Sequence, residues 1–173
     1  AIPLILAQSG SIQFYHQDDY VLRNISRKQP AQLTENDRAE ISRIFEITTR
    51  ADANPTTDRL VNMMNALKVA DRKHDQLTIA EKLADRNPSD LTLQQPLIYA
   101  QMRAGRYEHA RKTYDGFFNE KTGYTYNRLK PEERLALKLS AARLAEGDAK
   151  LDEAVGRYKD VYAEKPDYFP ERG

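Results

Sequence analysis

The chain has 173 residues, of which 40% are hydrophobic, 31% charged and 9% aromatic, a composition typical of one charge-rich globular domain with a hydrophobic core. Its 27 basic and 26 acidic residues nearly cancel, which argues against a dedicated nucleic-acid-binding protein with a basic excess. The chain contains no cysteine, so disulfides and thiolate metal sites are excluded.

Residues 1–33 are predicted to form an N-terminal arm that is partly irregular, with one short helix near residues 18–27. The longest apolar run, at residues 2–6, is far shorter than a membrane span, so we expect no membrane insertion by this segment. The opening AIPLILAQSG fits the end of a signal-peptide apolar region, and it fits an ordinary arm or strand as well. Both interpretations stay open, and this start favours the periplasm or cell envelope over the cytoplasm.

From residue 34 onward the sequence predicts helices almost throughout, because glycine is scarce and apolar residues recur at the helical period. Thr34, followed three residues later by Asp37, is a capping-box arrangement that starts the first helix. The segment DANPTTD around Pro55 ends this helix and supplies a cap for the next one. Short connections predict that consecutive helices pack as antiparallel hairpins. About seven helices are expected, at residues 34–50, 57–70, 76–88, 97–105, 107–118, 131–147 and 151–166, with a longer loop at about 121–131.

A repeat runs through these helices. A shift of 34 residues aligns Gln76 with Ala110. A further shift of 44 residues aligns Ala110 with Ala154 and Tyr114 with Tyr158. This interval is ten residues longer than the first because it includes the inserted loop. Self-similarity at this period is typical of arrays of helix hairpins.

On these residues the chain resembles the tetratricopeptide repeat (TPR) family, with units at about 57–90, 91–124 and 135–168. In that family each 34-residue hairpin has a small residue where its helices approach, a large residue between units, and a proline that ends the second helix. The matching residues are Ala110, Tyr114, Ala154, Tyr158, Pro88 and Pro166, and Gly105 falls at the turn of the second hairpin. The pattern is broken by Gln76, by Thr122 and by Pro96, which fits only if its helix begins near Gln94.

The resemblance implies an all-α fold, a right-handed superhelix of antiparallel hairpins (a TPR-like solenoid) over residues 34–168, with a truncated tail at 169–173. Repeat arrays close their last apolar face with a polar capping element, and none follows Pro166. We therefore expect either self-association or truncation from a longer polypeptide.

Motifs for catalysis are missing from the sequence. The spacing of HQDDY at residues 16–20 matches no standard metal motif, and we interpret this segment as a solvated arm. His74 and Asp75 are expected in a hairpin turn, and His109 on the surface. A histidine without a paired nucleophile is not a catalytic signature, so we predict no enzyme, no cofactor and no metal site.

Basic residues and tyrosines interleave between residues 103 and 114, a pattern that also suits single-stranded nucleic acid. On a helix, however, Tyr107 and Tyr114 share the buried face while Arg111 and Lys112 point elsewhere. Nucleic acid is therefore not expected as a partner.

The resemblance implies a concave groove lined by the first helix of each unit, which suits an extended or helical peptide. An acidic or C-terminal carboxylate ligand would match its arginines, because Arg pairs with carboxylates in bidentate fashion; a merely solvated face is the alternative. The family's carboxylate clamp for chaperone tails matches at Asn65 alone, so an EEVD-type tail is not expected. The groove positions carried over from the family that we expect to contact a partner are Asn65, Lys68, Tyr99, Met102, Arg103, Leu139 and Arg143.

The inserted loop is a second candidate surface. It carries Tyr124, Tyr126 and Arg128, residue types that are enriched at interfaces, although the rings also suit packing over the neighbouring hairpin. The sequence thus favours a non-enzymatic protein–protein interaction module. The alternative is a soluble or periplasmic arm of a larger envelope secretion or assembly protein, mainly structural or self-associating.

Overall fold

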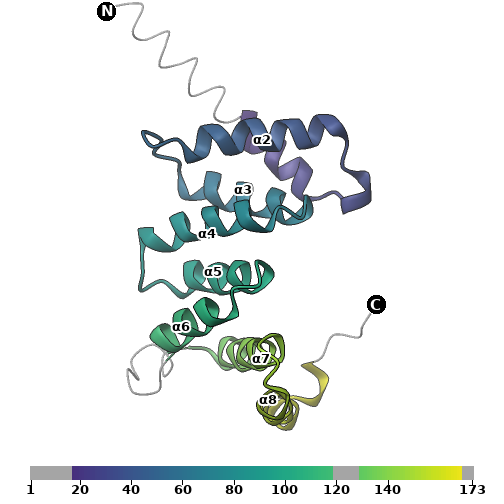
Figure 1. Cartoon of the computed structure of the whole chain (residues 1–173), viewed down its shortest axis with the longest axis vertical. Helices are drawn as coiled ribbons and strands as arrows, with labels where there is room; N and C mark the ends of the chain where they lie inside the picture. Colours follow the sequence, from purple (N-terminus) through teal and green to yellow (C-terminus); the bar gives the residue numbers. More distant parts are fainter. Residues whose placement is uncertain (1–16, 119–128, 169–173) are drawn as a thin grey trace, which may run out of the picture. The chain divides into compact units, whose positions relative to one another are not determined.

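The computed structural model describes residues 17–118 and 129–168, and all regular structure in these ranges is helical (Figure 1). Residues 17–26 form a helix, and seven further α-helices and two 3-10 helices follow. The all-α prediction is therefore confirmed, with eight α-helices in the described ranges. The chain separates into two compact units, residues 1–88 and 89–173, which divide the predicted repeat domain after Pro88.

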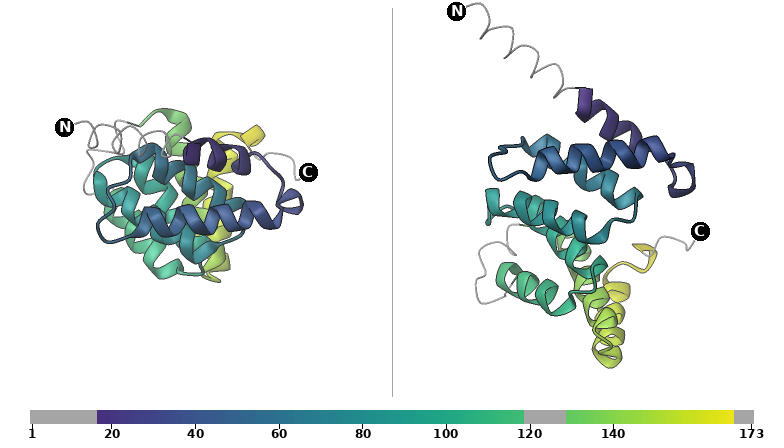
Figure 2. Two further views of the ribbon diagram at one scale, coloured as in Figure 1. Left: turned by 90° about the horizontal axis from the view of Figure 1, so that it is seen from above. Right: turned by 45° about the horizontal axis from the view of Figure 1, so that its top comes forward.

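The first unit contains the helix at 17–26, η1 (Pro30–Gln32), α2 (Glu35–Thr49), α3 (Thr57–Val69) and α4 (Lys73–Arg86). The start of α2 is as predicted: the Asp37 amide donates to the Thr34 hydroxyl at 3.1 Å, and the Thr34 amide donates to the Asp37 carboxylate at 2.8 Å. Leu22 and Ile25 are buried, and the N-terminal helix lies against α2 (Figure 2). The expected short helix near residues 18–27 is thus present, and it belongs to the core of this unit.

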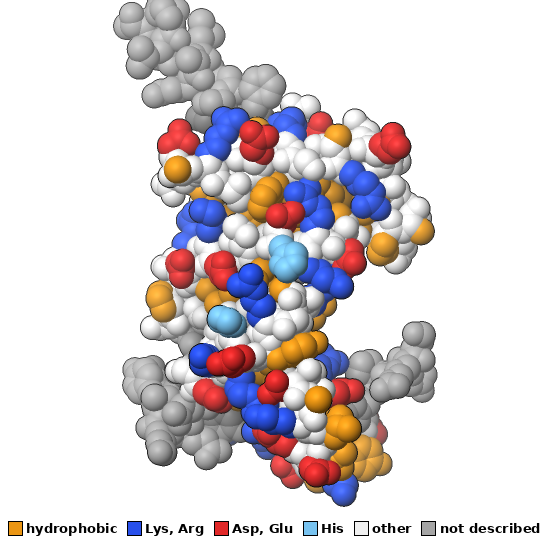
Figure 3. Space-filling view, viewed as in Figure 1, with side chains coloured by type: hydrophobic (Ala, Val, Ile, Leu, Met, Phe, Trp, Pro, Cys, Tyr) orange, Lys and Arg blue, Asp and Glu red, His pale blue; other side chains and the backbone are white. Residues whose placement is uncertain are grey.

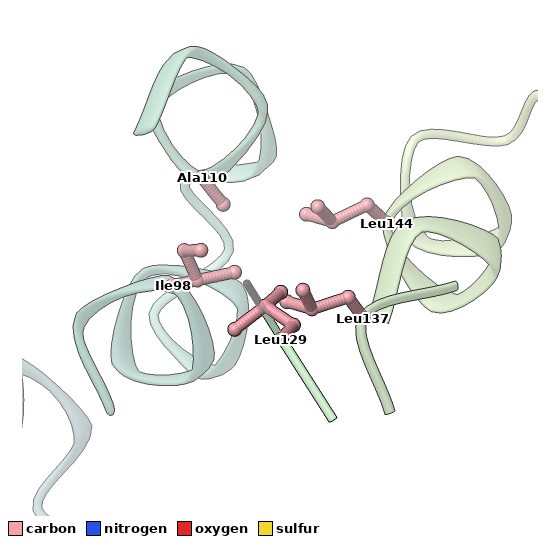
Figure 4. Close-up of a cluster of buried hydrophobic side chains, with 5 residues drawn as sticks. All are labelled: Ile98, Ala110, Leu129, Leu137 and Leu144. Carbon is pink, nitrogen blue, oxygen red and sulfur yellow. The ribbon is translucent and has the colours of Figure 1, made fainter. Parts of the chain in front are cut away.

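The second unit contains α5 (Leu91–Arg103), α6 (Tyr107–Phe118), α7 (Pro131–Gly147), α8 (Leu151–Glu164) and η4 (Pro166–Tyr168). Its larger core cluster joins α5, α6, α7 and the residue that leads into α7, and its smaller one joins α7 to α8. Figure 4 shows the larger cluster, which consists of Ile98, Ala110, Leu129, Leu137 and Leu144. The smaller cluster consists of Leu135, Leu139 and Val161, with Tyr158 packed against it.

The three hairpins α3–α4, α5–α6 and α7–α8 have turns of the same backbone conformation. Each turn contains one left-handed residue: Asp71 at φ 54°, Gly105 at φ 73° and Ala149 at φ 55°. The residue after it donates its amide to a carbonyl five positions earlier, at 2.8–3.0 Å in all three turns. The left-handed residues are 34 and 44 positions apart, which is the register of the sequence repeat.

Two boundaries differ from the sequence prediction. Helix α4 begins at Lys73, so His74 and Asp75 lie in its first turn rather than in the hairpin turn. Helix α5 begins at Leu91, capped by Asp90, which places Pro96 inside the helix. The proline is tolerated because the one intrahelical bond it removes would have reached the carbonyl of Thr92, an exposed first-turn residue that water can solvate.

Candidate functional site

Two of the predicted groove residues, Asn65 and Lys68, lie on α3 of the first unit. Both side chains are exposed, whereas the neighbouring Met64 and Leu67 are buried in the core. The alternation follows from the helical period, since residues three and four apart share a face. Asn65 and Lys68 therefore belong to the solvent-facing side of the first hairpin.

Tyr99 and Arg103 are brought together on α5 of the second unit. Tyr99 is 42% exposed, and the guanidinium carbon of Arg103 lies 5.9 Å from the centre of its ring. A cation over an aromatic face at this distance is stabilising by about 0.5–1 kcal/mol at an exposed site. The ring therefore helps to hold the Arg103 guanidinium in one place at the surface.

The other predicted residues of the second unit divide between surface and core. Met102 is half-buried and packs against the larger core cluster, and Arg143 on α7 is exposed. Leu139 is 8% exposed and packs with Leu135 and Val161, so its side chain holds the α7–α8 hairpin together and offers little surface to a ligand. The loop residues Tyr124, Tyr126 and Arg128 lie outside the described residues.

Helices α5 and α7 are connected through the core of the second unit, where Ile98 and Leu137 belong to one cluster (Figure 4). On α5 the helical period places Tyr99 and Arg103 beside the strip that carries Ile98. On α7 it places Arg143 beside the strip that carries Leu137. The exposed aromatic and both arginines therefore flank helix faces that meet in one core.

Arg111 of α6 has a structural role that the sequence did not predict. Its guanidinium lies 3.2 Å from the Asp148 carboxylate and 3.6 Å from that of Glu153. A hydrogen bond from Arg157, with Arg111 as a smaller contributor, lowers the pKa of Glu153 below its ordinary value. The second unit thus carries ion pairs that link α6 to the α7–α8 turn and to the start of α8.

The interpretation of HQDDY as a solvated arm is wrong for its two aspartates. The Asp19 carboxylate lies 2.5 Å from Nε of Arg59, and the Asp18 carboxylate lies 3.7 Å from the same guanidinium and 2.6 Å from that of Arg43. Arg59 is completely buried. A buried guanidinium requires charged partners because its desolvation is costly, so these aspartates anchor the N-terminal helix to α2 and α3.

A signal for this network is present in the sequence. Arg59 stands four residues before Met63 and eight before Leu67, and therefore on the apolar face of its helix. An arginine at such a position needs a carboxylate partner inside the fold. Identifying Asp19 as that partner requires the tertiary structure, since the two residues are 40 positions apart.

Among residues 17–118 and 129–168, no group of three or more metal-ligating side chains lies close enough together to hold a metal ion. Within the same ranges, no helix is long and apolar enough to cross a membrane.

No protein-family model, curated protein or solved structure matches this chain. The evidence on its architecture is therefore the shared backbone conformation of the three hairpin turns and their spacing of 34 and 44 residues along the chain.

Proposed function

We propose that the chain is a non-enzymatic protein-interaction module built from TPR-like hairpins in a right-handed solenoid, and that it binds an acidic segment of a protein partner. The observation that carries the proposal is the Tyr99–Arg103 pair, an exposed aromatic with a guanidinium over its ring. It lies on the first helix of a hairpin whose turn repeats at intervals of 34 and 44 residues. First helices are the ones that line the groove of such arrays.

The proposed groove of the second unit has Tyr99 and Arg103 on one wall and Arg143 on the other. In the proposed array the first helices run parallel, an arrangement in which the sides of α5 and α7 that carry these residues would adjoin. Two guanidinium groups favour carboxylates, because each pairs with two oxygens at once. Hydrogen bonds to charged groups contribute about 1.5–3 kcal/mol each. Arg103 is half-buried and Arg143 is exposed, so solvent screening should keep each contribution near the lower end of that range.

The experiment is a binding assay with a defined probe. An array of acidic peptides that end in a free carboxylate is screened against the wild-type chain, and the best binder is titrated by fluorescence anisotropy. We expect Arg103→Glu/Arg143→Glu to weaken binding at least tenfold, and Tyr99→Ala to weaken it less. Lys82→Glu/Lys112→Glu is the matched control, because both lysines are exposed and the two substitutions make the same charge change elsewhere on the chain.

Equal losses in the control and in the double variant would show that overall charge, and not this surface, attracts the peptide. Binding that survives the double variant would exclude the proposed groove.

A second candidate function is a mainly structural, self-associating arm of a larger envelope assembly. The observation that favours it is an exposed apolar face on α8.

A further inference from the structure

Within the described residues, helix α8 carries a stripe of apolar side chains that are largely exposed. Leu151, Val155 and Tyr162 are 63%, 51% and 58% exposed, and the half-buried Tyr158 lies between them. The intervals of four, three and four residues place these side chains on one face of the helix. This set is called the α8 stripe, and apolar side chains gather over α8 in the space-filling view (Figure 3).

The equivalent face of α6 shows what such a position does in this fold. The 44-residue shift of the repeat places Leu151 on Tyr107 and Val155 on Arg111. In α6 that face is covered by the following helix: the Tyr107 ring packs directly over Gly147 of α7, and Arg111 pairs with Asp148 just beyond the end of α7. The α8 stripe is thus the surface on which a further helix would pack.

We propose that a second copy of α8 occupies this stripe, in an antiparallel arrangement about a two-fold axis. An axis between residues 156 and 157 places Leu151 against the second copy's Tyr162, and Val155 against its Tyr158. Both halves of such an interface are the same patch, which is the requirement of a two-fold dimer.

The charges beside the stripe suit this arrangement. Asp152 and Lys159 are exposed on one edge of the stripe, close to its opposite ends, and the helical period places both on the same edge. In an antiparallel pair the same edges meet, so each Asp152 comes close to the Lys159 of the other copy. A parallel pair would lack these contacts.

The size of the stripe makes the dimer weak. Four side chains on each copy bury much less than the roughly 1,200–2,000 Å² of a stable protein–protein interface. Association at micromolar or higher concentrations is therefore expected, in exchange with the monomer. This inference does not depend on the peptide-binding proposal, because the two use different residues.

The experiment is sedimentation equilibrium of the full chain from micromolar to near-millimolar concentration. We expect the wild-type mass to rise from 19.9 kDa towards twice that value. Leu151→Glu/Val155→Glu should stay monomeric throughout, and its circular dichroism should match that of the wild type because both positions are exposed. Tyr20→Glu is a control for placing a carboxylate at an exposed apolar position away from α8: Tyr20 is similarly exposed on the N-terminal helix, and this variant should associate as the wild type does.

The charge pair supplies a test that is specific for the antiparallel second copy. Asp152→Lys alone and Lys159→Asp alone should each weaken association several-fold, and the double exchange should restore it. A wild-type chain that stays monomeric at every concentration would overturn the inference and assign the stripe to another partner's helix. Association that survives Leu151→Glu/Val155→Glu would also overturn it.

Discussion

The left-handed residues of the hairpin turns allow two substitutions with opposite expected effects on stability. Gly105 has φ 73° and no atom within 4 Å of the place where a Cβ would lie. Gly105→Ala therefore tests backbone strain without a steric clash. Ala149 has φ 55° in the equivalent turn of the α7–α8 hairpin, so Ala149→Gly is the reverse experiment within the same unit.

The magnitudes follow from two opposing terms. A left-handed conformation costs an L-residue roughly 1–2 kcal/mol, and glycine adds roughly 0.5–1 kcal/mol of unfolded-state entropy that folding must overcome. Gly105→Ala should therefore lower the free energy of unfolding by about 0.5–1 kcal/mol, and Ala149→Gly should raise it by a similar amount. In a domain of 60–100 residues, a change of 1 kcal/mol shifts the melting temperature by about 4–8 °C.

The assay is urea unfolding followed by circular dichroism, with the midpoint and the slope fitted separately. Gly156→Ala is the control: Gly156 lies inside α8 with open space around it, so the same chemical change should stabilise the helix by up to about 1 kcal/mol. The reasoning would be refuted if Ala149→Gly lowered the midpoint, or if Gly105→Ala and Gly156→Ala had the same sign.

Three further predictions concern the ion pairs and the helix contacts. Arg59→Met should lower the free energy of unfolding of the first unit by about 3 kcal/mol, measured in urea. This value is at the lower end of the range for breaking a buried ion pair, because the carboxylate partners of Arg59 keep some exposure. A loss below about 1 kcal/mol would contradict the anchoring role. Gly147→Ala should lower the melting temperature despite the better helix propensity of alanine, since the added Cβ would overlap the Tyr107 ring. In a Tyr107→Ala background the same substitution should no longer lower the melting temperature, and an equal loss there would argue against this contact. A hydrogen bond from Lys28 lowers the pKa of Asp37 below its ordinary value of 3.8. The Asp37 carboxylate therefore stabilises the fold above that pH, and this contribution is lost as the pH falls through the lower pKa of the folded state. The free energy of unfolding, measured between about pH 5 and pH 2, should depend less on pH in Asp37→Asn than in the wild type, and an unaltered profile would count against the predicted linkage.

Local signals in the sequence were sufficient for most of the helices. The capping residues Thr34 and Asp37 and the glycine at 105 each act through a few neighbouring bonds, so their effects can be read without tertiary structure. The start of the helix that contains Pro96 was predicted too late, because the rule that proline disfavours helix interiors does not say whether the carbonyl left without a donor can be solvated by water. In α5 that acceptor lies in the exposed first turn.

The candidate site was less predictable, since it depends on contacts between distant residues. The pairing of Asp19 with Arg59 spans 40 positions, and no local pattern in HQDDY indicates it. Leu139 was carried over as a groove position, yet its neighbours on the helix and on α8 make it part of the core. Tyr99 and Arg103 were each carried over as groove positions, and their separation of four residues accounts for the contact that the structure shows between them on one helix.

The most direct test of the proposed function is the affinity of the best acidic peptide for three chains: wild type, Arg103→Glu/Arg143→Glu, and the charge-matched control Lys82→Glu/Lys112→Glu. The account predicts that the double variant loses at least tenfold in affinity, while the control stays close to wild type. Equal affinities for all three chains, or equal losses in both variants, would contradict the claim that the α5–α7 surface recognises the ligand.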